Sequence, residues 1–205
     1  MFFKQFYDKH LSQASYLIGC QKTGEAMIID PIRDLSSYIR VADEEGLTIT
    51  HAAETHIHAD FASGIRDVAI KLNASIYVSG ESDDTLGYKN MPNHTHFVQH
   101  NDDIYVGNIK LKVLHTPGHT PESISFLLTD EGAGAQVPMG LFSGDFIFVG
   151  DIGRPDLLEK AVKVEGSSEI GAKQMFKSIE SIKDLPDYIQ TVSYTHLRAH
   201  ETGRN

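Results

Sequence analysis

The sequence lacks several features that would tie it to a membrane, to nucleic acid or to an oxidising compartment. Among 205 residues there is one cysteine, Cys20, which cannot form an internal disulfide. Eighteen Lys and Arg against 28 Asp and Glu give a formal net charge of -10. This charge argues against nucleic acid and anionic membrane surfaces as partners. No run of about 18 apolar residues and no signal-like N-terminus is seen, so we expect a cytoplasmic protein.

What the sequence does contain is typical of a globular protein. Hydrophobic residues make up 40% and charged residues 22%, and the length is enough for a domain with a substantial core. The helices are predicted to begin at Asp34, Ser63 and Ser168, and 80–100 is predicted to be irregular. Strands are predicted at 2–6, 15–19, 26–30, 47–54, 75–79, 102–105, 109–115, 124–128 and 139–143.

Strands in runs with helices between them predict an α/β (α+β) fold with two β layers flanked by helices. The helix from Ser168 to about Lys183 is predicted to bury one apolar face, formed by Ile170, Phe176, Ile179 and Ile182. Residues 1–190 are predicted to form one domain. Residues 191–205 lack apolar alternation and read like a translated sequencing adapter, so we expect a non-native tail there and a C-terminally truncated fold.

The segment from Thr55 to Phe61 holds three potential metal ligands within five residues, directly after a predicted strand. Side chains two residues apart on an extended backbone point the same way, so His56, His58 and Asp60 can face one cavity. A metal site needs ligands from elsewhere as well. His119 and Asp145 each follow an apolar strand-like run, and we expect the three loops to come together.

These motifs, together with Thr116-Pro-Gly-His119 and Gly144-Asp145, resemble those of the metallo-β-lactamase superfamily. The resemblance implies an αββα sandwich with a metal at one edge of the two sheets. Binuclear zinc hydrolases of that superfamily, such as glyoxalase II, carry a further histidine directly after the motif's aspartate. Here that residue is Phe61. Because an aromatic carbon ring cannot ligate a metal, the departure favours a mononuclear site.

The wider motif contexts resemble persulfide dioxygenases, most closely the bacterial kind that is joined to rhodanese modules. The resemblance implies one Fe(II) per chain, held by His56, His119 and Asp145. Two histidines and one carboxylate leave open positions where sulfur and O₂ can both bind iron, whereas zinc is redox-inert. His58 and Asp60 are then expected to orient ligands or to hydrogen-bond bound water. A direct metal-binding role for His58 stays open.

Two further residues are candidates for substrate contacts. Arg154 would hold an anionic substrate or brace the site through Asp151 or Asp156, and a purely structural salt bridge is an equally good interpretation. Phe61 would help to keep the pocket dry. The implied reaction oxidises a low-molecular-weight thiol persulfide with O₂ and water to sulfite and free thiol.

Two other functions remain open at this point. One is a zinc thiolester hydrolase of the glyoxalase II type, which would use a metal-bound hydroxide. The other is an inactive, truncated fragment of a larger sulfur-metabolism protein. A rhodanese domain is expected in the full-length parent, and the resemblance makes a homo-oligomer plausible.

Overall fold

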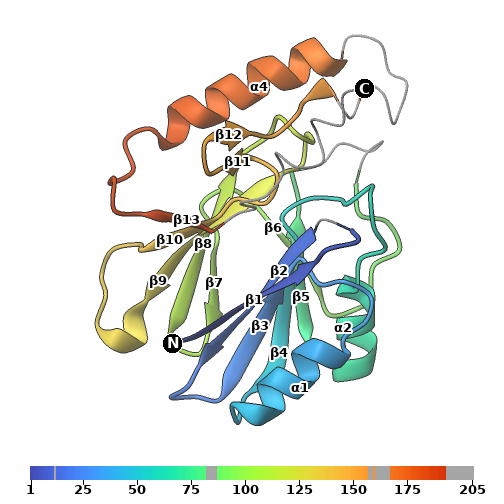
Figure 1. Cartoon of the computed structure of the whole chain (residues 1–205), viewed down its shortest axis with the longest axis vertical. Helices are drawn as coiled ribbons and strands as arrows, with labels where there is room; N and C mark the ends of the chain where they lie inside the picture. The colour runs from blue at the N-terminus through green and yellow to red at the C-terminus, as the bar shows by residue number, and fades with distance from the viewer. Residues whose placement is uncertain (12, 82–86, 157–158, 160–166, 193–205) are drawn as a thin grey trace.

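The computed structural model describes residues 1–205 except 12, 82–86, 157–158, 160–166 and 193–205. Two β-sheets stack face to face (Figure 1). The first sheet has the spatial order β1-β2-β3-β4-β5-β6, and the second has the order β13-β10-β9-β8-β7. The first is built from β1 (Phe2–Asp8), β2 (Gln13–Cys20), β3 (Glu25–Ile29), β4 (Thr48–Ala53), β5 (Ser75–Ser79) and β6 (Thr95–Val98).

The second sheet contains β7 (Asp103–Val106), β8 (Ile109–His115), β9 (Ile124–Asp130), β10 (Gly140–Phe142) and β13 (Gln190–Val192). A short 3₁₀ turn, η1 (Glu131–Ala133), follows β9, and a small hairpin pairs β11 (Ile147–Phe148) with β12 (Asp151–Ile152). Strand β12 lies outside the strands predicted from the sequence. Strand β7 pairs with β8 across Gly107, whose φ of 55° suits glycine.

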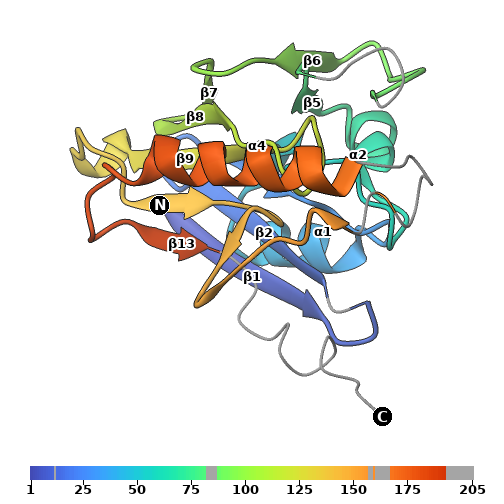
Figure 2. The same ribbon diagram turned by 90° about the horizontal axis from the view of Figure 1, so that it is seen from above.

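The helices α1 (Ser36–Glu44) and α2 (Ile65–Leu72) connect parallel strands on the outer face of the first sheet (Figure 1). A predominantly aliphatic cluster fills the space between these helices and the sheet, and a second cluster lies between the two sheets. Seen from above, α4 (Ser167–Ile182) crosses over the end of the sandwich (Figure 2). The predicted α/β fold is confirmed, and no helix within the described residues could cross a membrane.

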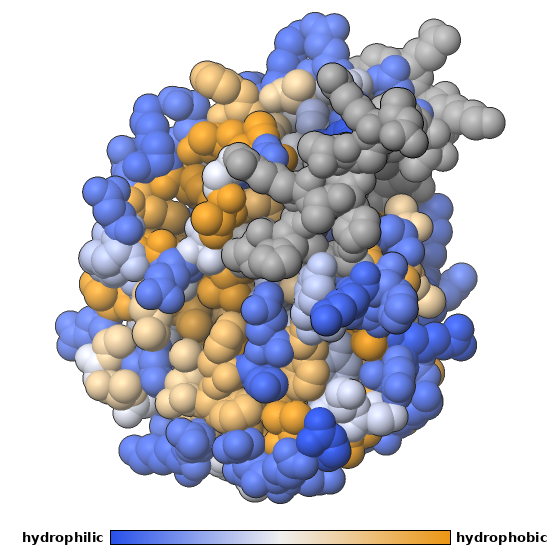
Figure 3. Space-filling model, viewed as in Figure 1, coloured by the Kyte–Doolittle hydropathy of each residue, from blue (hydrophilic) through white to orange (hydrophobic). Residues whose placement is uncertain are grey.

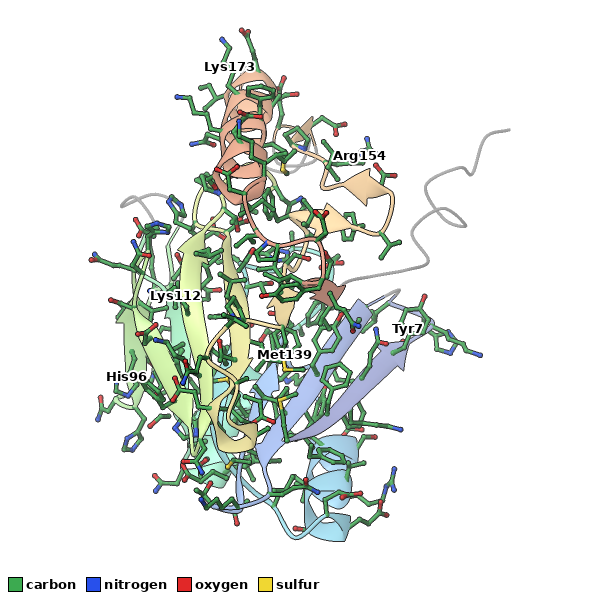
Figure 4. The ribbon with its side chains drawn as sticks, turned by 90° about the vertical axis from the view of Figure 1, so that its left-hand side faces the viewer. Tyr7, His96, Lys112, Met139, Arg154 and Lys173 are labelled. Carbon is green, nitrogen blue, oxygen red and sulfur yellow. The ribbon has the colours of Figure 1, made fainter. Side chains whose placement is uncertain are left out.

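The predicted buried face of α4 is wrong for two of its four residues, while Ile179 and Ile182 are half-buried. Ile170 is 61% exposed and Phe176 66% exposed. The helix instead turns Gly171, Met175 and Ser178 inward. Lys173 lies on the side of α4 that faces away from the sheets (Figure 4). The reason is that this face packs against the backbone of a glycine-containing loop, where only small or flexible side chains fit.

Two further segments are the stretch predicted to be irregular and the predicted tail. The stretch 80–100 contains β6, which lies at the edge of its sheet and pairs with β5 alone. Of the predicted tail, Thr191 and Val192 belong to β13, which pairs in parallel with β10, while 193–205 lie outside the described residues. Hydrophobic residues reach the surface of the face seen in Figure 3, and the edge strand β1 exposes Phe3 and Tyr7.

Candidate metal centre

Three loops that each follow a strand end meet at one end of the sandwich. The loop after β4 carries His56, the loop after β8 carries His119, and the loop after β10 carries Asp145. One potential ligand atom from each of these residues lies within 4.8 Å of the other two. This is the only such group among the residues that the structure describes.

The spacing and chemistry of this group suit a divalent transition metal. The His119 Nε2 atom lies 3.6 Å from Asp145 Oδ2, and the His56 and His119 ring centroids are 4.9 Å apart. Two ligand atoms at about 2.1 Å from one ion would be separated by roughly 3–3.5 Å. Two imidazoles and one carboxylate form a ligand set that such metals bind well.

His56 is held as a neutral imidazole. Its Nδ1 atom lies 2.9 Å from Thr55 Oγ1, and the Thr55 hydroxyl donates to Asp30 Oδ2 at 2.9 Å. Since that hydroxyl proton is committed to Asp30, the Thr55 oxygen accepts from His56 Nδ1–H, which leaves Nε2 for a metal. Burial lowers the pKa of His56 well below its ordinary value, and His58 and His119 add to this effect. The ring therefore keeps a free lone pair.

His119 is oriented by two neighbouring segments. Its Nδ1 atom lies 3.3 Å from the Arg154 carbonyl oxygen, so Nε2 is left facing Asp145. Its loop is pressed against α4, where the Ser178 hydroxyl donates to the Pro117 carbonyl at 2.7 Å. Gly118 has φ of 150°, and a Cβ there would lie 2.7 Å from the Met175 Cα. Glycine is therefore required by both backbone conformation and space.

Asp30 is a site residue that the sequence reasoning missed. Its carboxylate accepts from the Thr55 amide at 2.7 Å and from the Thr55 hydroxyl at 2.9 Å, and it lies 3.3 Å from His58 Nε2. Asp30 is buried and has φ of 52°, a conformation that Asp tolerates better than most residues. The available signal was an apolar strand ending in Asp directly before Pro31.

His58 and Asp60 lie outside the group of three. His58 is buried against Asp30, and its ring centroid is 4.2 Å from that of His56. Burial alone would lower the pKa of His58, but the hydrogen bond and charge of Asp30, with Glu54 and Asp145 nearby, raise it to about 9. Asp60 is exposed. The predicted roles of both side chains around a bound metal remain predictions.

Phe61 packs against His58. The two ring centroids are 4.4 Å apart with an interplanar angle of 39°. The residue that directly follows Asp60, where a binuclear site would have a further ligand, is therefore a carbon ring that covers one side of His58. Phe61 is half-buried, so part of its ring is available to line a pocket.

Arg154 lies at the same end of the molecule as α4 (Figure 4). Its Nε and Nη2 atoms donate to the two Asp156 carboxylate oxygens at 3.0 and 2.7 Å. Of the two predicted bracing partners, Asp156 thus pairs with Arg154, and Asp151 accepts from the neighbouring Ile152 amide. Together with the carbonyl contact to His119, this pair favours bracing over substrate binding.

Comparison with known proteins identifies the family. A crystal structure of a metallo-beta-lactamase from Staphylococcus aureus subsp. aureus COL is 95% identical, with a TM-score of 0.88 over 93% of this chain and 54% of that chain. ETHE1 from Myxococcus xanthus is 30% identical, with a TM-score of 0.72 over 93% of this chain and 75% of that chain. A hydroxyacylglutathione hydrolase from Rhodospirillum rubrum is 31% identical over 83% of this chain and 57% of its own length.

The chain thus spans a little over half the length of the first of these structures and of the curated relatives it matches. Its fold, its three motif-bearing loops and its histidine and aspartate ligand set agree with one family description, which matches residues 9–196. The chain belongs to the metallo-β-lactamase superfamily.

Proposed function

We propose that this chain carries the metal site of a non-haem Fe(II) enzyme that oxidises a low-molecular-weight thiol persulfide with O₂. The observation that carries the proposal is Phe61. It stands where a binuclear hydrolase would have another histidine, close to the group of two histidines and one carboxylate. In this proposal His56, His119 and Asp145 hold one iron per chain, and zinc is the alternative ion.

The ligand set leaves coordination positions free, and an iron bound there would supply the redox chemistry that O₂ activation requires. The overall reaction balances as RSSH + O₂ + H₂O → RSH + H₂SO₃, with sulfite forming after loss of protons. The terminal sulfur is oxidised and O₂ is reduced, so no further co-reactant is needed. The relationship to ETHE1 supports this function.

The protein's own residues would orient the reactants and limit water. Phe61 offers a half-buried apolar ring beside His58, which would exclude water from one side of the reacting sulfur. Protonated His58 would place a positive charge close to an anionic persulfide. Arg154 would act mainly through its backbone contact with His119, because its guanidinium group is already paired with Asp156.

A zinc thiolester hydrolase is the second candidate, and the hydroxyacylglutathione hydrolase relative supports it. This function would require a metal-bound hydroxide as nucleophile. The candidate of another class is an inactive fragment of a larger sulfur-metabolism protein, which the partial coverage of the relatives motivates. A rhodanese domain in the parent, a homo-oligomer and a cytoplasmic location belong to the proposal as well.

The test begins with metal content. The protein is purified without oxygen and its metals are measured by elemental analysis. We expect close to one iron per chain, followed by O₂ consumption and sulfite release on addition of glutathione persulfide. Two zinc ions per chain with hydrolysis of S-lactoylglutathione would replace the dioxygenase by the hydrolase. Loaded iron without either activity would support the fragment, provided that a longer chain restores turnover.

A further inference from the structure

Glu122 is a buried carboxylate that contacts two loops at once. Only 1% of it is exposed, and its Oε1 atom accepts from the Ile57 backbone amide at 2.9 Å. The same oxygen accepts from the Thr120 hydroxyl, also at 2.9 Å. Ile57 lies between His56 and His58, and Thr120 directly follows His119. One oxygen atom thus joins the two loops that carry the histidine ligands.

The acceptor of the Ile57 amide is Glu122, which lies 65 residues away in the sequence. A buried carboxylate oxygen without a donor is costly, and the two bonds to Glu122 Oε1 satisfy an atom that is shielded from water. A second bond supports the same junction, since the Ile124 amide donates to the Thr55 carbonyl at 2.8 Å. These bonds hold the two loops relative to each other, and they are made by groups other than the side chains of His56, His119 and Asp145.

We infer that Glu122 is a positioning residue that fixes the distance between His56 and His119. We call Glu122 a latch because its side chain is long enough for Oε1 to reach the Ile57 amide and so to link the two loops. Its negative charge as such is secondary. The inference rests on the metal site of the proposed function, but not on which reaction occurs there.

Two conservative variants separate length from charge. Glu122→Gln keeps the reach and an acceptor oxygen but removes the charge. Glu122→Asp keeps the charge but is one methylene too short to reach Ile57. A latch predicts that the Gln variant resembles the wild type and that the Asp variant does not. A role based on charge alone predicts the reverse order.

The probe is Co²⁺, which binds histidine and carboxylate ligands and reports their geometry through its visible absorption. Affinity is measured by chelator competition on the whole chain. We expect Glu122→Asp to weaken Co²⁺ binding by about 10- to 100-fold and to change the visible spectrum, as loss of an orienting contact around a metal does. Glu122→Gln should stay within about threefold of the wild type and keep its spectrum.

Val106→Ala serves as the control for general loss of stability. Val106 is fully buried on β7, next to the Gly107 turn and at the far end of β8 from His115. It should lower the melting temperature and leave Co²⁺ affinity unchanged. If Glu122→Asp does not fold, Glu122→Met, which keeps the length and removes the acceptor, takes its place.

The latch would be overturned if Glu122→Asp bound Co²⁺ with wild-type affinity and spectrum. It would also be overturned if Val106→Ala weakened Co²⁺ binding as much as Glu122→Asp does. Failure of the wild-type chain to bind any divalent metal would instead refute the metal site of the proposed function. The two failures are therefore distinguishable.

Discussion

The buried carboxylate of Asp30 should dominate the stability of the metal-binding loops. It receives three contacts, from the Thr55 amide, the Thr55 hydroxyl and His58, at 2.7, 2.9 and 3.3 Å. Hydrogen bonds to charged groups contribute about 1.5–3 kcal/mol each, and breaking a buried charge pair costs about 3–5 kcal/mol in total. We take the second range as the better guide, because the three contacts share one carboxylate and do not add.

The two substitutions Asp30→Asn and Asp30→Ala should differ in a defined way. Asn tolerates the positive φ of this position and its amide oxygen can still accept from the Thr55 backbone. It loses the charge opposite His58, so we expect a cost of about 2–3 kcal/mol. Ala loses all three contacts and adds about 1 kcal/mol of backbone strain, for a total of about 4–6 kcal/mol.

The assay is thermal and urea unfolding of the metal-free chain. For a domain of this size about 1 kcal/mol corresponds to roughly 2–4 °C, so Asp30→Asn should lower the melting temperature by about 4–12 °C. Asn73→Ala is the matched control for strain alone, since Asn73 has a φ of 53° but ends α2. Equal losses for Asn and Ala, or a loss below about 1 kcal/mol for both, would refute the reasoning.

Three shorter predictions concern the metal and α4. Asp145→Ala should abolish metal retention, measured by elemental analysis, whereas wild-type occupancy would show that Asp145 is not a ligand. Phe61→His should raise the metal content from one toward two per chain, and an unchanged content would remove the argument built on Phe61. Met175→Ala should lower the free energy of unfolding in urea by about 2–5 kcal/mol, because Met175 is 2% exposed. Phe176→Ser should lower it by less than about 0.5 kcal/mol. The reverse order would show that Phe176, and not Met175, lies on the buried face of α4.

The strands that the sequence predicted best are those with a buried or alternating apolar pattern. The strand predicted at 75–79 has those bounds in the structure, and the strands predicted at 102–105 and 109–115 correspond to the antiparallel pair β7 and β8. Strand β6 was missed because an edge strand exposes residues on both sides, as His96 and Phe97 do. Such a strand has no apolar alternation for a pattern to detect.

The candidate ligands could be found from sequence because each is a metal-binding side chain placed directly after a strand. Asp30 and Glu122 could not, because their function is to accept hydrogen bonds from residues far away in the sequence. Nothing in the local pattern around Glu122 distinguishes it from an acidic residue that faces solvent. For Asp30 the local signal is an apolar strand that ends in Asp before Pro31, and this signal does not name the residues that Asp30 accepts from. The three-dimensional arrangement of the loops is needed to see the difference.

The error on α4 has a different physical origin. Helical periodicity correctly predicted a helix, and burial of its largest apolar side chains was the simplest expectation. Leaving a Phe side chain exposed forgoes about 1.5–3 kcal/mol of hydrophobic stabilisation. The opposite face of α4 is buried instead, because its small or flexible residues let the helix approach the loop at Pro117 and Gly118 closely. These residues are Gly171, Met175 and Ser178. The packing of α4 thus supports the loop that carries His119. The periodicity of apolar residues failed to predict the buried face here because that face is shaped by the loop of the metal site.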